Sequence, residues 1–464
     1  SIFSVWQEHQ GLGLLAGNAH AADIPHQIIL FLFSLIAPIN FLRQVYVFLM
    51  LFLGGIGTYL LISQITPSKK SNSINIFPIL GALFYLFNLS TIQTFYVPFE
   101  PFIAHFAFLP LLLYGLILFL KKPSRKHFYV FALLNIASLP QAQVPTIFFV
   151  YLTALFTIFL VFNLYKRTKF HIIQSIKIII LTFIVNAFWL LPFLYFTFTN
   201  VNVALNAKIN QMTTQTVFLQ NKEFGNITDV MLLKGFWFNN VDPNTQGDFD
   251  YMLTPWRDHL SNIFISGIGY LFFAIILLGL FEAIRKKSPI LLSFVILFII
   301  AFTLLGNATP PFSYIDTLFR KIPIFNEIFR FPFTKLSILA SLIYSVFFVI
   351  GIQKLSEWIK KQIVVSIAIC LMVIFVFPIF QGHLFYSKVR IDIPREYFDL
   401  FKYFKNQNPN QKIYQFGIAT SSKIKRFFYF QTLLIMKFSI FIHKPIIISF
   451  YLLAGLVKKK ELIC

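Results

Sequence analysis

Residues 223–258 read EFGNITDVMLLKGFWFNNVDPNTQGDFDYMLTPWRD and form the centre of a polar segment that runs from Thr199 to Asn262. This segment, which we call the acidic loop, is the longest polar stretch between two strongly apolar halves of the chain. It contains six acidic residues and only four basic ones, whereas the flanking halves join hydrophobic segments through basic loops. We interpret the acidic loop as lying outside a membrane, above a site buried among helices.

The composition predicts an all-α polytopic membrane protein. Of the 464 residues, 57% are hydrophobic and 12% are charged, whereas a soluble domain carries roughly 25% charged residues. Many windows exceed the ~18 apolar residues that a helix needs to cross the hydrocarbon core. A large soluble protein is the alternative, but it would need helices that are apolar on every face. Basic residues recur in the loops between the hydrophobic segments, and this pattern argues against a soluble protein.

The net charge of +22 does not indicate binding to nucleic acid. Lys and Arg residues of polytopic proteins gather in cytoplasmic loops beside anionic membrane lipids, and this placement accounts for much of the excess. The two cysteines, Cys370 and Cys464, offer neither a disulfide framework nor the spacing of a metal site. We interpret them as a buried apolar thiol and an accidental terminal thiol.

Ten hydrophobic segments are predicted to be transmembrane helices. They cover residues 43–63, 75–92, 102–120, 128–141, 145–163, 177–197, 263–283, 289–306, 336–353 and 363–380. The fourth is too short for a full crossing and ends in LPQAQVP at residues 139–145, which predicts a broken helix. Residues 26–38 rise about 1.5 Å each and cannot cross the core, so we expect an interfacial or partly inserted helix there.

Basic residues fall in alternate loops, which predicts the orientation in the cytoplasmic membrane. The basic loops centre on residues 69–70, 121–126, 166–169, 285–287 and 354–361. The positive-inside rule places these loops in the cytoplasm. The remaining loops then face outward, namely residues 1–42, 93–101, 199–262 and 307–335.

Both ends of the chain carry further expectations. The chain opens in a polar, Gly-containing stretch, so we expect more residues upstream, including a first membrane span. After a membrane domain at residues 1–380, residues 381–464 are expected to form a short, incomplete outer segment that begins with an amphipathic helix up to Phe404 and a strand at 412–416. Beyond about Ser421, either residues 438–456 form an eleventh span or the segment is truncated or out of frame, and we favour the second interpretation.

The opening loop brings acids and imidazoles together beside the short helix. Glu8 precedes His9, and Asp23 lies between His20 and His26. A carboxylate in this place is a candidate general base that deprotonates a sugar hydroxyl. The same side chains are of the types that bind a divalent metal, but their irregular spacing supports a metal only weakly.

The second candidate is the stretch FRFPFTK at residues 329–335. Arg330 and Lys335 would stand at the outer boundary of the ninth span, where Arg offers forked donors and Lys a point charge to a lipid phosphate. An anchor for ordinary phospholipid headgroups is the simpler alternative. The sequence has no Gly-rich phosphate loop in its cytoplasmic segments, so the expected donor is an activated lipid rather than a soluble nucleotide.

A non-enzymatic lipid or polysaccharide transporter, or flippase, is the alternative function. Such a protein needs polar side chains along a path through its spans. Only a few isolated ones are present, namely Asn88, His105, Asn135 and Asn186. We find neither an inverted repeat nor a filter-like or charged ring. Gathering of these four side chains in one cavity would favour transport.

Five short motifs follow one another along residues 1–416. They are Trp6…Gly11…Pro25-His26, GALFYLFN at 81–88, LPL at 109–111, NAFWLLP at 186–192 and FRFPFTK at 329–335. Together they resemble bacterial GT-C class glycosyltransferases, with the alpha-(1→3)-arabinofuranosyltransferase type as the most similar branch. A related branch glycosylates lipoteichoic acid. Each motif is short, so their order is the better evidence.

The resemblance implies transfer of a sugar from a polyprenyl-phosphate carrier to a cell-envelope glycan or lipid acceptor outside the cytoplasmic membrane. It also implies a catalytic acid in the first outer loop. In this chain that acid is Glu8 or Asp23, unless it lies upstream of Ser1, in which case the fragment alone would be inactive. Outer domains, often carbohydrate-binding, follow the last spans in this family.

We therefore expect a glycosyltransferase in which Arg330 and Lys335 hold the carrier phosphate and stabilise its leaving charge. The acidic loop is expected to cover the acceptor groove. Its candidate acceptor-binding residues are Trp237, Trp256, Arg257 and Asp258. The donor sugar, the acceptor and any need for metal are not readable from the sequence.

Overall fold

The structure is a computed structural model that describes residues 6–7, 14–15, 21–38, 41–66, 75–205, 219, 222–244, 248–322, 325, 329–389 and 395–406. The chain divides into two compact units. The larger unit comprises Ala22–Asp242 and Phe249–Val389, and the smaller one comprises Ser1–Ala21, Pro243–Asp248 and Arg390–Cys464. Residues 381–389, which we assigned to the C-terminal segment, thus cluster with the helices.

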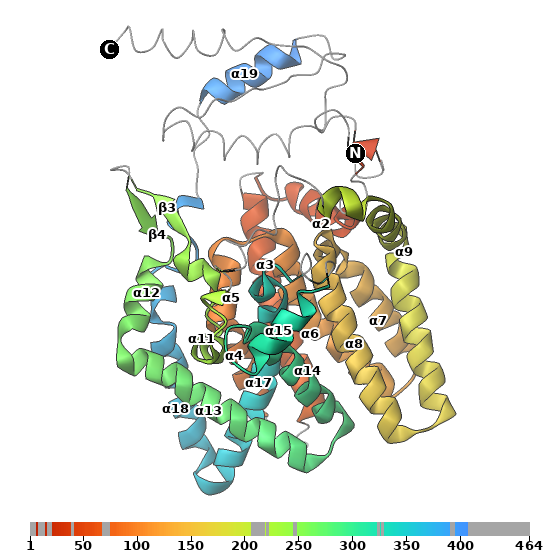
Figure 1. Ribbon diagram of the computed structural model, residues 1–464, viewed down its shortest axis with the longest axis vertical. Coiled ribbons are helices and arrows are strands. Elements are labelled where there is room, and N and C mark those ends of the chain that lie inside the picture. The colour runs from red at the N-terminus through yellow and green to blue at the C-terminus, as the bar shows by residue number, and fades with distance from the viewer. Residues whose placement is uncertain are drawn as a thin grey trace. The chain divides into compact units, whose positions relative to one another are not determined.

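The larger unit is a bundle of α-helices (Figure 1). Its first half contains α2 (Ile24–Ser34), α3 (Leu42–Ile65), α4 (Ile76–Leu86), α5 (Leu89–Tyr96), α6 (Glu100–Lys121), α7 (Arg125–Ala137), the 3₁₀-helix η2 (Leu139–Gln143), α8 (Pro145–Lys166) and α9 (Lys169–Leu205). Its second half contains α13 (Ile263–Lys286), α14 (Pro289–Leu305), α15 (Phe312–Phe319), α17 (Pro332–Trp358), α18 (Lys361–Phe375), η4 (Phe377–Ile379) and η5 (Ser387–Val389). All ten predicted segments are helical.

Six of the described helices are long and apolar enough to cross a membrane, namely α3, α6, α8, α9, α13 and α17. A seventh crossing results if α4 and α5, which meet at a bend of 49°, count as one span. The helices α7, α14 and α18 have 13, 17 and 15 residues and are shorter than a full crossing. The protein is therefore a helical membrane protein, and the predicted count of ten spans is not confirmed.

Asn88 explains the bend between α4 and α5. Its side-chain oxygen accepts a hydrogen bond from the Thr91 amide at 3.1 Å and caps α5. Its side-chain nitrogen donates to the carbonyls of Phe84 at 3.0 Å and Tyr85 at 2.8 Å, at the end of α4. One buried side chain thus satisfies the backbone groups that the break releases, which membrane helices require.

The break predicted after the fourth segment is present between α7 and α8, at η2. Pro140 and Pro145 stand in the first turns of η2 and α8, where the missing N–H of proline does least harm. Gln141 in this break contacts α6, because its Oε1 lies 2.7 Å from Nδ1 of His105. The break is therefore covered by protein.

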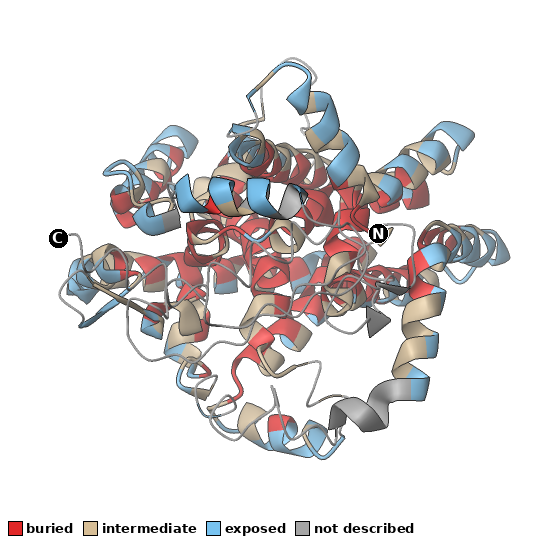
Figure 2. Ribbon diagram, turned by 90° about the horizontal axis from the view of Figure 1, so that it is seen from above, coloured by how far each residue is buried: buried red, intermediate tan, exposed pale blue. Residues whose placement is uncertain are grey.

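The helices α6 and α17 form the centre of the bundle, since 89% and 94% of their apolar windows are buried. Figure 2 shows buried residues concentrated on the central helices and exposed residues on the peripheral ones. Gly279 of α13 and Gly351 of α17 allow these two helices to touch along their backbones, because a Cβ atom at Gly279 would clash with the carbonyl of Phe347. Such small-residue contacts are the usual means of packing helices in lipid.

Contacts join several basic loops at one end of the larger unit, which we call the basic end. Lys121 Nζ donates to the Gln64 carbonyl at 2.5 Å, and Lys361 Nζ lies 4.8 Å from the centre of the Phe77 ring. The opposite end, where α3 and α6 begin and α5 ends, is called the loop end. These contacts bring three of the predicted basic loops together, while the placement of all the loops and the side of the membrane that each end faces stay predictions.

The short helix expected near residues 26–38 is α2, whose 11 residues are too few to cross a membrane. It exposes Ile28, Phe31 and Leu32 and buries His26. One face is therefore apolar and exposed, as an interfacial helix requires.

The smaller unit contains β1 (Trp6–Gln7), paired antiparallel with β2 (Leu14–Leu15), and the helix α19 (Arg395–Lys405). The helix α19 matches the predicted amphipathic stretch. Glu8, His9 and His20, together with the predicted strand at 412–416 and the alternative span at 438–456, lie outside the described residues.

The start of the acidic loop was predicted wrongly, because α9 continues to Leu205 instead of ending near residue 197. The described part of the loop is also more ordered than a plain connection. It contains α11 (Ile227–Leu232), η3 (Phe236–Asn239), the paired strands β3 (Val241–Pro243) and β4 (Phe249–Tyr251), and α12 (Thr254–Ser261).

Candidate functional site

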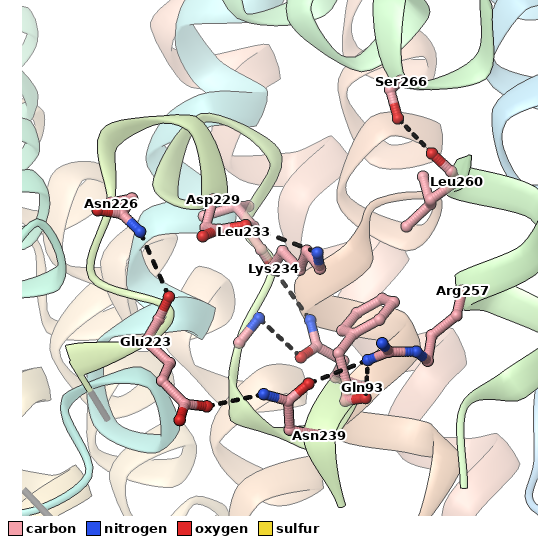
Figure 3. A network of polar contacts seen from close by, with 12 residues as sticks. Gln93, Glu223, Asn226, Asp229, Leu233, Lys234, Asn239, Arg257, Leu260 and Ser266 are labelled. Atoms are coloured by element: carbon pink, nitrogen blue, oxygen red, sulfur yellow. Dashed lines mark hydrogen bonds and ion pairs between the residues drawn. The ribbon is translucent and has the colours of Figure 1, made fainter. Parts of the chain in front are cut away.

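The acidic loop is bonded to α5 and to the middle of α17. Gln93 of α5 donates to the Leu233 carbonyl at 2.9 Å and accepts from the Gly235 amide at 3.0 Å (Figure 3). Tyr344 of α17 donates to the Val230 carbonyl at 3.1 Å. These buried bonds hold residues 230–235 directly on the helices, so this part of the loop is a fixed wall of the site.

Arg257 holds the loop together internally. Its Nη1 donates to the Phe238 carbonyl at 2.7 Å and to Asn239 Oδ1 at 3.0 Å, and Asn239 in turn donates to Glu223 at 2.7 Å (Figure 3). Its guanidinium also lies 3.8 Å from the centre of the Tyr251 ring. These contacts give Arg257 a role in the loop's own structure, whereas the neighbouring Asp258 is exposed.

The two tryptophans of the loop differ in exposure. Trp256 is fully buried, and its indole N–H donates to the His383 carbonyl at 2.8 Å. Trp237 is partly exposed and stacks on Phe236 with ring centres 5.3 Å apart. Stacking on a sugar needs an accessible ring face, so Trp237 is the better placed of the two predicted acceptor contacts.

Trp237 belongs to a row of four rings at the loop end, which we call the aromatic row. Phe99 lies 6.3 Å from Trp237, and Phe236 lies 5.2 Å from Phe331. The row starts beside Glu100, the first residue of α6, and ends beside Arg330. It therefore runs along the loop end to the neighbour of Arg330, one of the two predicted phosphate-binding residues.

Lys335 is a buried cation with an incomplete set of partners. It is 8% exposed, and its Nζ donates to the Thr334 hydroxyl at 2.8 Å. Arg330 lies near enough to repel its charge. Among the described residues, no carboxylate lies within 4.0 Å of Lys335 Nζ. A buried cation at a membrane boundary is costly, so this arrangement favours an anionic ligand.

A cavity of about 20 Å³ opens beside the start of α17, between apolar side chains and the polar residues Lys234 and Asn307. This volume holds about one water molecule, so a sugar would need a more open conformation. Lys234 Nζ lies 3.7 Å from Asp229. Burial raises the pKa of the Asp229 carboxyl, and the charge of Lys234 opposes this shift.

The other predicted acid, Asp23, lies at the start of α2 in a buried cluster. Its Oδ1 is 2.9 Å from His26 Nδ1, and its Oδ2 accepts from Gln27 at 2.5 Å. The His26 ring packs on Tyr46 of α3, with centres 4.2 Å apart. The Tyr46 hydroxyl is buried and has no hydrogen-bond partner among the described residues.

The structure brings Asp23 close to His26, but no described contact joins Asp23 to Arg330 or Lys335. Sequence reasoning missed Tyr46 and Gln93. The signal that could have found Gln93 is its position in an apolar run, five residues after Asn88. A polar side chain there needs a hydrogen-bond partner outside its own helix.

The polar residues of the spans have separate partners. Asn135 accepts from Tyr151 at 3.2 Å, and Asn186 accepts from the Trp189 indole at 2.8 Å. Asn88 serves the α4–α5 bend and His105 contacts Gln141. Each of the four is therefore bonded to neighbouring protein groups. Within the described part of the chain, no group of three or more His, Cys, Asp or Glu residues is arranged to hold a metal ion.

Comparison with known proteins gives one partial match. Residues 24–227 match the family model described as a 6-pyruvoyl-tetrahydropterin synthase related domain, a membrane protein. The matched region, less than half of the chain, runs from α2 to the start of α11 and supports the membrane assignment. No curated protein and no solved structure matches the chain.

Proposed function

We propose that this protein is a GT-C type glycosyltransferase of the cytoplasmic membrane. It moves a sugar from a polyprenyl-phosphate carrier to a cell-envelope glycan or lipid acceptor at the outer face. The observation that carries this proposal concerns Lys335, which is buried, feels the charge of Arg330, and has no carboxylate within 4.0 Å of its Nζ among the described residues. The order of the sequence motifs supports the same class.

The carrier phosphate is the anion that we assign to this pair. Lys335 lies in the first turns of α17, whose unsatisfied amide groups also favour negative charge. The prenyl chain would remain in lipid beside the bundle. During transfer, negative charge grows on the departing phosphate, and cations fixed in a dry site stabilise it more than water does.

The acceptor is assigned to the aromatic row. Trp237 offers a partly exposed ring, and the row continues from it through Phe236 to Phe331, the neighbour of Arg330. An acceptor sugar stacked on Trp237 would lie on the same row of rings as this predicted phosphate-binding residue. Opening of the small cavity at Phe333 would be needed to admit it.

Transport is the weaker alternative. A flippase needs a polar path through the bundle, whereas Asn135 and Asn186 are each bonded to a different neighbouring side chain. An anion site at one end of the bundle, without such a path, favours chemistry at that end.

The test is transfer of labelled sugar by the purified protein in liposomes. The donors are polyprenyl-phosphate arabinofuranose, mannose, glucose and galactose, and the acceptor is a cell-envelope glycan and lipid extract. We expect Arg330→Ala/Lys335→Ala to lower kcat by about 100-fold or more, as loss of a charge-stabilising donor does. Lys321→Ala, at an exposed lysine of the same end, is the matched control.

Two results would contradict the proposal. Absence of transfer by the wild-type protein from all four donors would remove the assigned activity. Wild-type rates in the double variant would remove the phosphate role of Arg330 and Lys335 while leaving the enzyme class intact.

A further inference from the structure

We propose that the C-terminal ends of α13 and α17 together bind the headgroup of an acidic phospholipid at the basic end. The site consists of Arg285, Lys286 and Lys287 at the end of α13 and Lys354 near the end of α17, and we call it the α13–α17 cluster. This inference does not depend on the proposed glycosyl transfer, which is assigned to residues at the start of α17.

The ends of these two helices lie close to each other. The helices α13 and α17 touch along their backbones, because a Cβ atom at Gly351 would clash with a carbonyl of α13. Beyond this contact, Glu357 of α17 accepts a hydrogen bond from Lys354 at 2.6 Å. Lys286 and Arg285 of α13 lie near enough for their charges to act on the same carboxylate. Cations from two helices therefore gather around one exposed acid.

The acids of this region neutralise only part of its positive charge. Glu357 is paired as described, and Glu282 pairs with Arg285 at 2.9 Å. Within the described part of the chain, no carboxylate lies within 4.0 Å of the Nζ atoms of Lys286 and Lys287, and both side chains are exposed. Two lysines thus remain to attract the phosphate of an acidic lipid, which is enriched in the cytoplasmic leaflet.

Apolar side chains adjoin the cations and favour a lipid over a free anion. Phe281 and Ile284 of α13 and Trp358, the last residue of α17, are all exposed. The guanidinium of Arg285 lies 5.9 Å from the centre of the Phe281 ring, and Lys354 Nζ lies 5.7 Å from that of Trp358. Aromatic rings beside cations are typical of the membrane interface. A phospholipid would place its phosphate on the lysines and its acyl chains along these apolar groups, whereas free phosphate would use the lysines alone.

The bound lipid would hold a peripheral helix against a central one. In α13 only 28% of the apolar window is buried inside the protein, whereas in α17 the value is 94%. A headgroup that contacts the ends of both helices adds a link between them. Because a ligand that binds only the folded state stabilises it, this lipid should raise the stability of the protein.

The test measures thermal unfolding of the purified protein in a neutral detergent during titration with phosphatidylglycerol, phosphatidylcholine or inorganic phosphate. We expect phosphatidylglycerol to raise Tm by about 2 °C or more, and the other two to have little effect. Lys286→Gln/Lys287→Gln should weaken the apparent affinity for phosphatidylglycerol by about 10-fold or more, since two cations are lost. The control is Arg125→Gln/Lys126→Gln, which removes two exposed cations from a different basic loop and should bind as the wild-type protein does.

Four results would overturn the proposal. Absence of any rise in Tm with phosphatidylglycerol would remove the site, and an equal rise with phosphatidylcholine would remove its preference for acidic lipids. An equal rise with inorganic phosphate would make it a site for free anions. Equal losses of affinity in the two double variants would show that the lipid responds to the charge of the basic end as a whole, and not to the α13–α17 cluster.

Discussion

At the scale of single residues, the buried and partly buried charges of the loop end divide into two kinds. Asp316 is paired with Arg320 at 2.8 Å, and Asp229 faces Lys234 at 3.7 Å. Lys335 has the Thr334 hydroxyl but no described carboxylate in reach. Burying an ion without a counter-ion costs stability, so a site that tolerates this cost is expected to gain function from it.

Asp229 carries a prediction about pH. Burial raises the pKa of its carboxyl above the ordinary 3.8, so the folded chain holds this proton to a higher pH than the unfolded chain does. Its contribution to stability therefore falls as the pH rises from about 3.8 upward. We expect the Tm of Asp229→Asn, relative to wild type, to increase between about pH 3.5 and about pH 7. Thermal unfolding in detergent measures this difference, with the exposed Asp258→Asn as control; a difference that stays constant or decreases would contradict it.

At the scale of elements, the sequence predicted where helices lie better than where they end. Apolar runs are local signals that the sequence shows directly, and all ten segments predicted from them are helical in the structure. The break at η2 was predicted because Pro140 and Pro145 mark it, whereas the α4–α5 bend was not, because Asn88 stands alone in an apolar run. The end of α9 was missed because residues 198–205 contain neither Gly nor Pro.

The contacts of the candidate site likewise divide into those that local spacing predicts and those that depend on packing between distant segments. Asp23 and His26 are three residues apart, so their contact follows from local helical spacing. Tyr46 and the aromatic row depend on packing between distant segments, which no spacing in the sequence reveals. Trp256 likewise packs against a distant segment, because its indole N–H donates to the carbonyl of His383, 127 positions along the chain.

The contact between α13 and α17 predicts a large effect of one substitution at Gly279 and a small effect of the same substitution at Gly267 of the same helix. Gly279 faces the backbone of α17, whereas nothing lies within 4 Å of a Cβ atom at Gly267. We expect Gly279→Val to lower stability by about 2 kcal/mol or more, because an added side chain forces the helices apart. Gly267→Val should change it by less than about 1 kcal/mol. Thermal unfolding and size-exclusion chromatography in detergent compare the two; equal stabilities would show that close packing at Gly279 is unnecessary.

At the scale of the whole molecule, both ends of the larger unit carry paired charges. Glu100, Asp229 and Asp316 pair with Arg43, Lys234 and Arg320, whereas Glu282 and Glu357 pair with Arg285 and Lys354 in the basic loops. The proposed chemistry needs only the loop end, since the carrier phosphate and the acceptor are both assigned there. The assignment of this end to the outer face is therefore the point on which the cellular role depends.

Cysteine labelling tests that orientation. The native cysteines are first removed by Cys370→Ser and Cys464→Ser. Single cysteines are then introduced at four exposed positions. Lys321→Cys and Asp258→Cys report on the loop end, and Lys122→Cys and Lys287→Cys report on the basic end. If basic loops face the cytoplasm, a membrane-impermeant maleimide labels the first two in intact cells and the last two only after permeabilisation. The reverse pattern would place the Lys335 site inside the cell, away from any outer acceptor. Labelling of all four in intact cells would contradict the alternation of loops itself, because helices that cross the membrane must separate the two ends.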